Sequence, residues 1–309
     1  MSAAIVTPRP MALLVTVALA IVLSCERRTA PLHVDTSRRL PEAAPEAKGV
    51  LRFAIGTRIS PRAMVEGRQR LAAWLGARLG RGVSVAQRET YAETNDLLAR
   101  GEVDFALVCS GAFVALPSQT IELLAAPSTK GTATYHSLVL VRQQDPATRF
   151  EELRGRRFAF VDALSLTGRL YPESLARKAG GTFFSDSVYT HSHTESIRMV
   201  ATARVEAAAV DSLVFDLMTH DDPGLLSRVR VLLKSPAFGS PPIVARRGLD
   251  PKLVEAMRTA LLQMHEDAQG RGLLVELGFD KFVPVDPRAY ESVRLVRMEA
   301  YGVDGEMAP

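Results

Sequence analysis

Two hydroxyl residues and a glycine stand together in Ser165-Leu166-Thr167-Gly168, between the apolar run FAFV and a predicted helix with Pro172 in its first turn. N–H groups at the start of a helix lack intrahelical acceptors, and the helix dipole favours negative charge there. Ser165 and Thr167 would add directional donors. The segment therefore predicts a cradle for a small anion. The alternative is that Ser165 or Thr167 only caps the helix.

A histidine and a tyrosine stand at the start of two other predicted helices. Ser192-His193-Thr194-Glu195 has the spacing of a capping box, followed by a helical pattern. His193 could donate a hydrogen bond to an oxyanion or merely cover the helix end. Tyr91 could bond a ligand or pack in the core.

Cys109-Ser110-Gly111 follows the apolar run VDFALV, so these residues come at the end of a predicted strand. A buried, inert thiol is the common state of such a cysteine. The position at a strand end keeps a ligand role open for Cys109. The only other cysteine in the chain is Cys25.

The N-terminus has the pattern of an export signal. Met11 to Ser24 is an uncharged apolar run of 14 residues after Arg9. A membrane span needs roughly 20 residues, so the run fits the apolar core of a signal peptide. The run ends in Val22-Leu23-Ser24-Cys25, which is similar to a bacterial lipobox. The expectation is a signal peptide over 1–24, lipidation of Cys25 and a Pro-containing tether over 25–49, with an ordinary signal peptide or a short anchor as the alternative.

Predicted strands and helices alternate along the part of the chain that contains these residues. Apolar runs predict strands that begin at Val50, Val83, Val103, Leu138, Arg157, Ser187, Ala207 and Val229. Helical patterns lie between most of them, which is typical of an α/β fold with sheets rich in parallel strands. Such sheets bind ligands at the carboxyl ends of their strands, where the candidate residues stand.

The composition of the 309-residue chain excludes some classes of function. Its net charge of +4 comes from scattered Lys and Arg, so no nucleic-acid surface is indicated. His191 and His193 are close, but nothing completes a metal site, and no cofactor is expected. Ser165, His193 and Asp211 are the types of a hydrolase triad, yet the Gly-x-Ser-x-Gly pattern is missing.

The order of these segments resembles the PhnD-like phosphate, phosphite and phosphonate substrate-binding proteins of ABC transporters, in the type 2 periplasmic binding protein superfamily. The resemblance runs from about Val50 to Asp286, with FVDALSLTG and the histidine of SHTES as its most specific parts. It implies two α/β lobes joined by a hinge, with the ligand in the cleft between them. Lobe one would be 50–136 plus 233–286, lobe two 137–232, and 287–309 a C-terminal tail.

The resemblance also implies roles for single residues. Ser165, Thr167 and Gly168 would hold the oxygens of a small oxyanion, with His193 opposite them and Tyr91 supplied by lobe one. The further positions that it places at the ligand are Thr57, Cys109, Ser110, Tyr135 and Asp211. The partners would be a permease and, through the lipid anchor, a bacterial membrane; the protein would be periplasmic or on the cell surface.

Cys109 departs from the family pattern, which usually has a small residue there. Related periplasmic arsenite sensors use a cysteine for recognition, and a thiolate suits a thiophilic ion. The alternative function is therefore an oxyanion sensor that signals to a histidine kinase.

Overall fold

The structure is a computed structural model that describes residues 49–56 and 63–302. The predicted signal peptide, the lipidation site Cys25, nearly all of the tether, and Thr57 lie outside the described residues. Within the described residues, no helix is long and apolar enough to cross a membrane.

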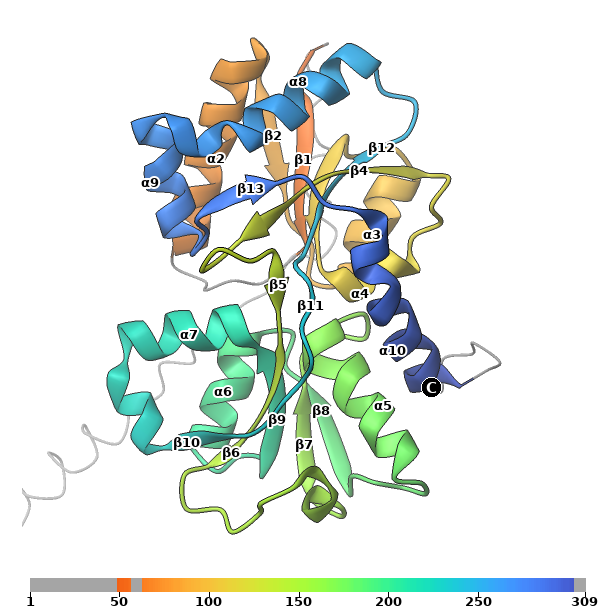
Figure 1. Cartoon of the computed structure of the whole chain (residues 1–309), viewed down its shortest axis with the longest axis vertical. Coiled ribbons are helices and arrows are strands. Elements are labelled where there is room, and N and C mark those ends of the chain that lie inside the picture. The colour runs from red at the N-terminus through yellow and green to blue at the C-terminus, as the bar shows by residue number, and fades with distance from the viewer. Residues whose placement is uncertain (1–48, 57–62, 303–309) are drawn as a thin grey trace, which may run out of the picture. The chain divides into compact units, whose positions relative to one another are not determined.

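The first sheet has six strands in the order β13-β4-β12-β3-β1-β2 (Figure 1). Its strands are β1 (Leu51–Gly56), β2 (Val83–Ala86), β3 (Phe105–Val108), β4 (Ile121–Ser128), β12 (Ile243–Arg246) and β13 (Lys281–Val283). Its helices are α2 (Ala63–Leu79), α3 (Tyr91–Ala99), α4 (Ser110–Ala115), α8 (Pro251–Leu262) and α9 (Ala268–Glu276), with a 3₁₀ turn at Met264–Glu266. We call this part lobe one.

The second sheet has five strands in the order β10-β6-β9-β7-β8. Its strands are β6 (Ser137–Arg142), β7 (Arg157–Phe160), β8 (Asp186–Tyr189), β9 (Ala207–Asp211) and β10 (Val229–Lys234). Its helices are α5 (Tyr171–Lys178), α6 (His193–Ala201) and α7 (Ser212–Asp221), with short turns η1 (Phe150–Leu153), η2 (Leu166–Leu170) and η3 (Pro223–Ser227). We call this part lobe two.

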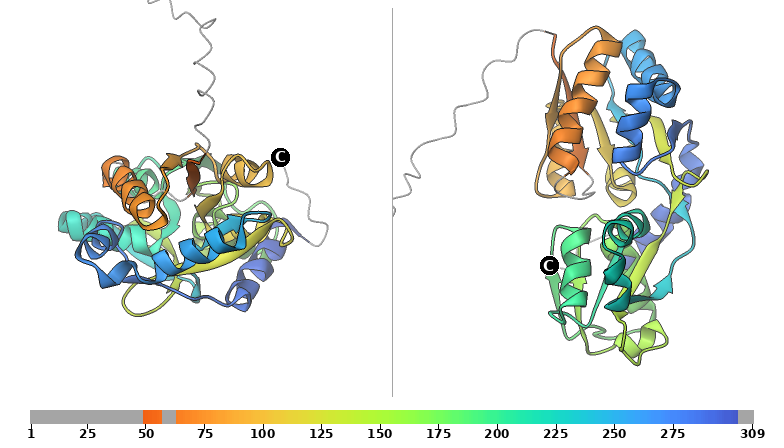
Figure 2. Two further views of the ribbon diagram at one scale, coloured as in Figure 1. Left: turned by 90° about the horizontal axis from the view of Figure 1, so that it is seen from above. Right: turned by 90° about the vertical axis from the view of Figure 1, so that its left-hand side faces the viewer.

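Alternating side chains give each sheet two buried faces. Phe53 and Ile55 of β1 pack with α2, α8 and α9, whereas Ala54 faces the cluster that holds α3 and α4. In lobe two, Val139 and Val141 face Phe150 and α5, whereas Leu138 and Leu140 face α6 and α7. Helices therefore cover both faces of each sheet, as expected of an α/β fold; the helices can be followed in Figures 1 and 2.

The pairing of strands is mixed rather than mainly parallel. β1 pairs in parallel with β2 and β3, but β12 is antiparallel to β3 and β4, and β13 to β4. In lobe two, β6 is antiparallel to β9 and β10. The expectation of parallel-rich sheets was wrong in this respect, because β4, β12 and β13 were not foreseen and the chain passes between the lobes more than once.

Two crossing segments pair with each other between the sheets. β5 (Thr134–Tyr135) and β11 (Phe238–Gly239) form a two-stranded antiparallel ribbon. The C-terminal segment is also ordered, with η5 (Pro287–Tyr290) and α10 (Glu291–Tyr301). α10 contacts α4 of lobe one and α5 of lobe two, and buries Val293, Val296 and Ala300, so residues 287–301 are not a tail (Figure 1).

Candidate functional site

The loop after β7 folds back on its own strand. Val161 N–H donates to the Gly168 carbonyl at 3.1 Å, and Ser165 Oγ accepts the Gly168 N–H at 3.0 Å. A Cβ on Gly168 would lie 2.5 Å from Val161 Cγ2, so only glycine fits this approach. Ser165 is therefore the cap of the helical segment that begins with η2, and the Gly168 N–H is already paired within the loop.

Thr167 supplies an unpaired polar group in the same loop. Its side chain is 1% exposed, and its Oγ1 has no hydrogen-bond partner in the part of the chain that the structure describes. The Thr167 carbonyl accepts the hydroxyl of Ser137, the first residue of β6, at 2.6 Å. A buried hydroxyl without a partner costs about 1–3 kcal/mol, so Thr167 Oγ1 is a strong candidate for contact with a ligand.

His193 and Asp211 meet at the ends of α6 and β9. The Asp211 N–H donates to His193 Nδ1 at 3.1 Å. Burial lowers the pKa of His193 to about 3, so the ring is neutral. A neutral ring that accepts at Nδ1 carries its proton on Nε2, which makes Nε2 a hydrogen-bond donor.

One of the two hydrogen bonds of the expected capping box is formed at the start of this helix. Ser192 Oγ accepts the Glu195 N–H at 3.3 Å, as predicted. The Glu195 carboxylate instead pairs with Arg204 at 2.9 Å. His193 is thus held by the cap and by the Asp211 N–H.

Asp211 ends β9 and caps α7. Its Oδ1 accepts the Leu213 N–H at 2.7 Å, while burial raises the pKa of its carboxyl to about 7. Its backbone pairs with Ser137 in the register of β6 and β9. The contact of Ser137 with Thr167 therefore joins Asp211, His193 and the loop in one neighbourhood.

Cys109 of lobe one and Tyr135 of the crossing strand β5 both lie near Asp211. Burial raises the pKa of the Cys109 thiol to about 11, although the N–H groups of Leu166 and Gly111 lower it in part. Tyr135 is 1% exposed, and its Oη lacks a partner among the described residues. Burial raises the pKa of Tyr135, and the nearby Cys109 and Asp211 raise it further. Both groups are neutral at physiological pH, and a thiol held protonated is poorly suited to a thiophilic ligand.

Ser110 and Tyr91 are also buried where the two lobes meet, a region that we call the buried junction. Each makes a hydrogen bond there that involves a backbone group. Ser110 Oγ donates to the Gly239 carbonyl of β11 at 2.6 Å, which ties α4 to the crossing ribbon. The Tyr91 N–H donates to Asp162 Oδ2 at 3.1 Å, from lobe one to lobe two.

Asp162 was not assigned a role from the sequence. It is buried, and its Oδ1 also accepts the Leu164 N–H at 2.8 Å. The available signal was a carboxylate directly after an apolar strand, in front of the cradle segment. The structure therefore brings nine predicted residues to one junction: Tyr91, Cys109, Ser110, Tyr135, Ser165, Thr167, Gly168, His193 and Asp211.

The hydrolase alternative does not fit this geometry. A triad histidine donates from Nδ1 to a carboxylate, whereas His193 Nδ1 accepts a backbone N–H of Asp211. Ser165 Oγ caps Gly168. Among the described residues, no group of three His, Cys, Asp or Glu side chains could hold a metal ion.

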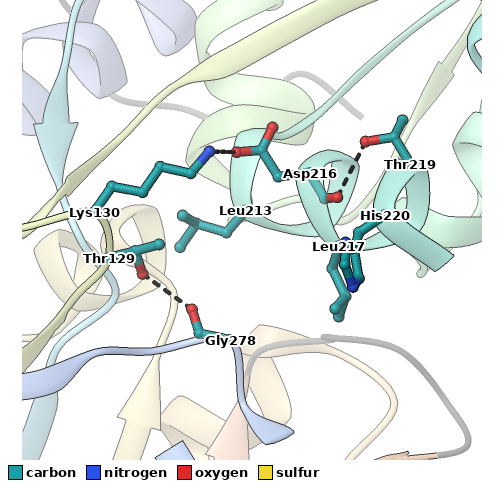
Figure 3. Close-up of a pocket in the computed structure, with 8 residues that line it drawn as sticks. All are labelled: Thr129, Lys130, Leu213, Asp216, Leu217, Thr219, His220 and Gly278. Carbon is teal, nitrogen blue, oxygen red and sulfur yellow. Dashed lines mark hydrogen bonds and ion pairs between the residues drawn. The ribbon is translucent and has the colours of Figure 1, made fainter. Parts of the chain in front are cut away.

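A pocket of 490 Å³ lies at a different and more exposed place (Figure 3). Across it, Lys130 Nζ pairs with Asp216 Oδ2 of α7 at 2.6 Å, and Thr129 Oγ1 donates to the Gly278 carbonyl. The Lys130 and Asp216 side chains are 78% and 50% exposed. These polar groups are hydrated or paired with each other, so this pocket is the weaker candidate for an anion site.

Comparison with known proteins identifies the family of the chain. A family described as the periplasmic substrate-binding protein of phosphonate ABC transporters matches residues 53–290. A binding protein component of an ABC phosphonate transporter from Pseudomonas aeruginosa is 19% identical, with a TM-score of 0.72 over 82% of this chain and 87% of that chain.

Two further structures show the same two-lobed fold. The PhnD1 protein of Prochlorococcus marinus, in complex with methylphosphonate, is 15% identical, with a TM-score of 0.74 over 84% of this chain and 99% of that chain. A Xanthomonas citri protein bound to ATP is 20% identical, with a TM-score of 0.70 over 84% and 100% of the two chains. Since the family match covers most of its length, the chain belongs to the periplasmic substrate-binding proteins of phosphonate ABC transporters, which are binding components and not enzymes.

Proposed function

We propose that this protein captures a small phosphorus oxyanion, of the phosphonate class, at the junction of its two lobes and delivers it to its permease. The observation that carries the proposal is the buried Thr167 hydroxyl, whose Oγ1 has no partner among the described residues. It belongs to the loop that the Ser137 hydroxyl joins to Asp211 and His193. Methylphosphonate bound to the Prochlorococcus marinus relative supports the choice of ligand class.

The binding mechanism follows from the neutrality of these groups. Hydroxyl and imidazole donors can meet the oxygens of an anion where water is excluded, and such hydrogen bonds are stronger than those between neutral groups. Asp211, whose carboxyl has a pKa of about 7, can remain protonated and donate, or accept from a protonated ligand oxygen. Discrimination among oxyanions would depend on which oxygens find donors and which find acceptors.

A thermal-shift panel on the full chain in mild detergent tests the proposal. It would contain phosphate, phosphite, methylphosphonate, aminoethylphosphonate, sulfate, arsenate and arsenite. A ligand at about 100 times its dissociation constant adds roughly 2.7 kcal/mol to the stability of the folded protein, which is readily measured. We expect at least one phosphorus oxyanion to raise the melting temperature. If none of them does, the proposal is refuted.

The panel also tests the alternative function, an oxyanion sensor, because it contains arsenite. An arsenite shift that disappears in Cys109→Ser would replace transport by sensing as the proposed function. Because the Cys109 thiol is buried and protonated, we expect no arsenite shift and unchanged oxyanion shifts in Cys109→Ser.

We also propose that the protein is anchored by lipid on Cys25, on the strength of the Val22-Leu23-Ser24-Cys25 pattern alone. Metabolic labelling with a fatty acid should mark the wild type and leave Cys25→Ser unlabelled. Equal labelling of both proteins, or of neither, would contradict the lipid anchor.

A further inference from the structure

Gly111, the second residue of α4, touches the backbone of the other lobe. A Cβ at this position would lie 2.3 Å from the Leu164 carbonyl oxygen and 2.8 Å from the Leu166 nitrogen. Contacts this short do not occur for a real Cβ, so this approach requires glycine. The backbone of Gly111 is not in the left-handed region, so alanine would fit the helix itself.

The atoms that Gly111 meets cannot move independently of the candidate site. Leu164 and Leu166 flank Ser165, and Thr167 follows directly. The Leu164 N–H is held by Asp162, and the Gly168 N–H by Ser165 Oγ. Hydrogen bonds within the loop therefore hold its shape. A side chain on residue 111 would push the lobes apart instead of displacing one flexible group.

The same junction holds two further contacts between the lobes. The Tyr91 N–H reaches Asp162 Oδ2 at 3.1 Å, and the Leu166 N–H lies near the Cys109 sulfur. Both contacts come from segments of lobe one that pack beside α4 in one hydrophobic cluster. The approach of Gly111 thus limits how closely this whole cluster can reach the loop.

We propose that Gly111 sets the closed distance between the lobes and so determines ligand affinity without contacting the ligand. The inference rests on the proposed function, in which the ligand is held between the lobes. A protein whose binding-competent form is populated only in a small fraction binds more weakly by that fraction. Alanine at position 111 should reduce the closed fraction and leave each lobe intact.

Gly272 supplies a matched control. It also lies in a helix, α9, it has no positive φ, and nothing lies within 4 Å of the position that a Cβ would take there. Gly111→Ala and Gly272→Ala would be compared with the wild type in the full chain. Calorimetry with methylphosphonate, ligand-free melting, and hydrogen exchange of the segment 162–170 would be measured for each.

We expect Gly272→Ala to bind and exchange like the wild type and to melt at the same or a slightly higher temperature, because alanine favours a helix over glycine. Gly111→Ala should bind at least about tenfold more weakly, exchange faster in 162–170 without ligand, and keep its ligand-free melting temperature. Binding and exchange within twofold of the wild type would overturn the inference. A Gly111→Ala protein that does not fold would also overturn it, because the contact would then serve stability and not closure.

The exchange measurement separates this inference from the proposed function. If the wild type binds no phosphorus oxyanion, the proposed function fails. Faster exchange of 162–170 in Gly111→Ala alone would still support the role of Gly111, and equal exchange in all three proteins would refute it.

Discussion

Two places where the lobes meet differ in whether their polar groups are paired and exposed to solvent. At the buried junction, Cys109, Gly111 and Tyr91 of lobe one meet the loop Asp162–Gly168 of lobe two, and Thr167 Oγ1 has no partner among the described residues. At the exposed junction, Lys130 and Asp216 form an ion pair in contact with water. The exposed pair is screened by solvent and contributes little, whereas an unpaired hydroxyl in the interior is costly until a partner arrives.

This difference indicates where binding energy is available. A ligand at the buried junction gains hydrogen bonds that the protein itself does not satisfy. A ligand at the exposed junction would have to break the ion pair between Lys130 and Asp216 and displace water. Substitutions at both junctions test this difference.

The largest effect is expected from Thr167→Val, which keeps the shape of the side chain and removes the hydroxyl. Hydrogen bonds to charged groups contribute about 1.5–3 kcal/mol, so affinity for the oxyanion should fall by about 10-fold or more. The ligand-free protein should melt at the same or a higher temperature, because a buried group without a partner is removed. Calorimetry and melting curves would check both, and unchanged affinity would exclude Thr167 from the site.

An intermediate effect is expected on the pH dependence of stability. The pKa of Asp211 is raised to about 7, so its contribution to stability is present in acid and is lost as pH rises through about 7. The pKa of His193 is lowered to about 3, so stability falls as pH drops from about 6.5 through 3. Between about pH 4 and 6.5 the two slopes have opposite signs and offset each other.

Substitution of either residue should leave only the pH dependence of stability that the other one causes. Relative to the wild type, Asp211→Asn should gain stability as pH rises across about pH 4–6.5, and His193→Asn should lose it, each by at most about 1.4 kcal/mol per pH unit. Asn can still cap α7 in place of Asp211, and an Asn oxygen can accept the Asp211 N–H in place of His193 Nδ1. Parallel curves for all three proteins in chemical denaturation would show that neither group is buried as described.

The smallest effect is expected from Lys130→Met at the exposed junction. The ion pair is mostly in solvent, so oxyanion affinity should stay within twofold of the wild type and the melting temperature should change little. A large loss of affinity would reverse the contrast and move the site to the pocket of Figure 3.

Local patterns in the sequence were sufficient to locate the strand and helix ends that carry most of the candidate site. The strand before Cys109, the helix start at Tyr91 and the cap at Ser192 were all foreseen, because hydrophobic periodicity and capping residues act over a few neighbours. The antiparallel strands β4, β12 and β13 and the packing of α10 were missed. Their pairing depends on partners far along the chain, such as β4 with β12, which no local pattern reveals.

The candidate site likewise combines features that the local sequence reveals with features that depend on distant contacts. The residue types at Thr167 and His193 were visible in the sequence, but their states were not. That Gly168 N–H is already taken, that His193 accepts at Nδ1, and that Asp162 joins the lobes all depend on tertiary contacts. The requirement for glycine at 111 likewise comes from a loop more than 50 residues away in the chain.

A crystal structure of the protein with methylphosphonate would show whether the ligand binds at the buried junction. We expect the phosphonate oxygens within hydrogen-bond distance of Thr167 Oγ1 and His193 Nε2, with both lobes in contact with the ligand. A phosphonate bound beside Lys130 in the exposed pocket, with the junction at Thr167 unchanged, would contradict this claim.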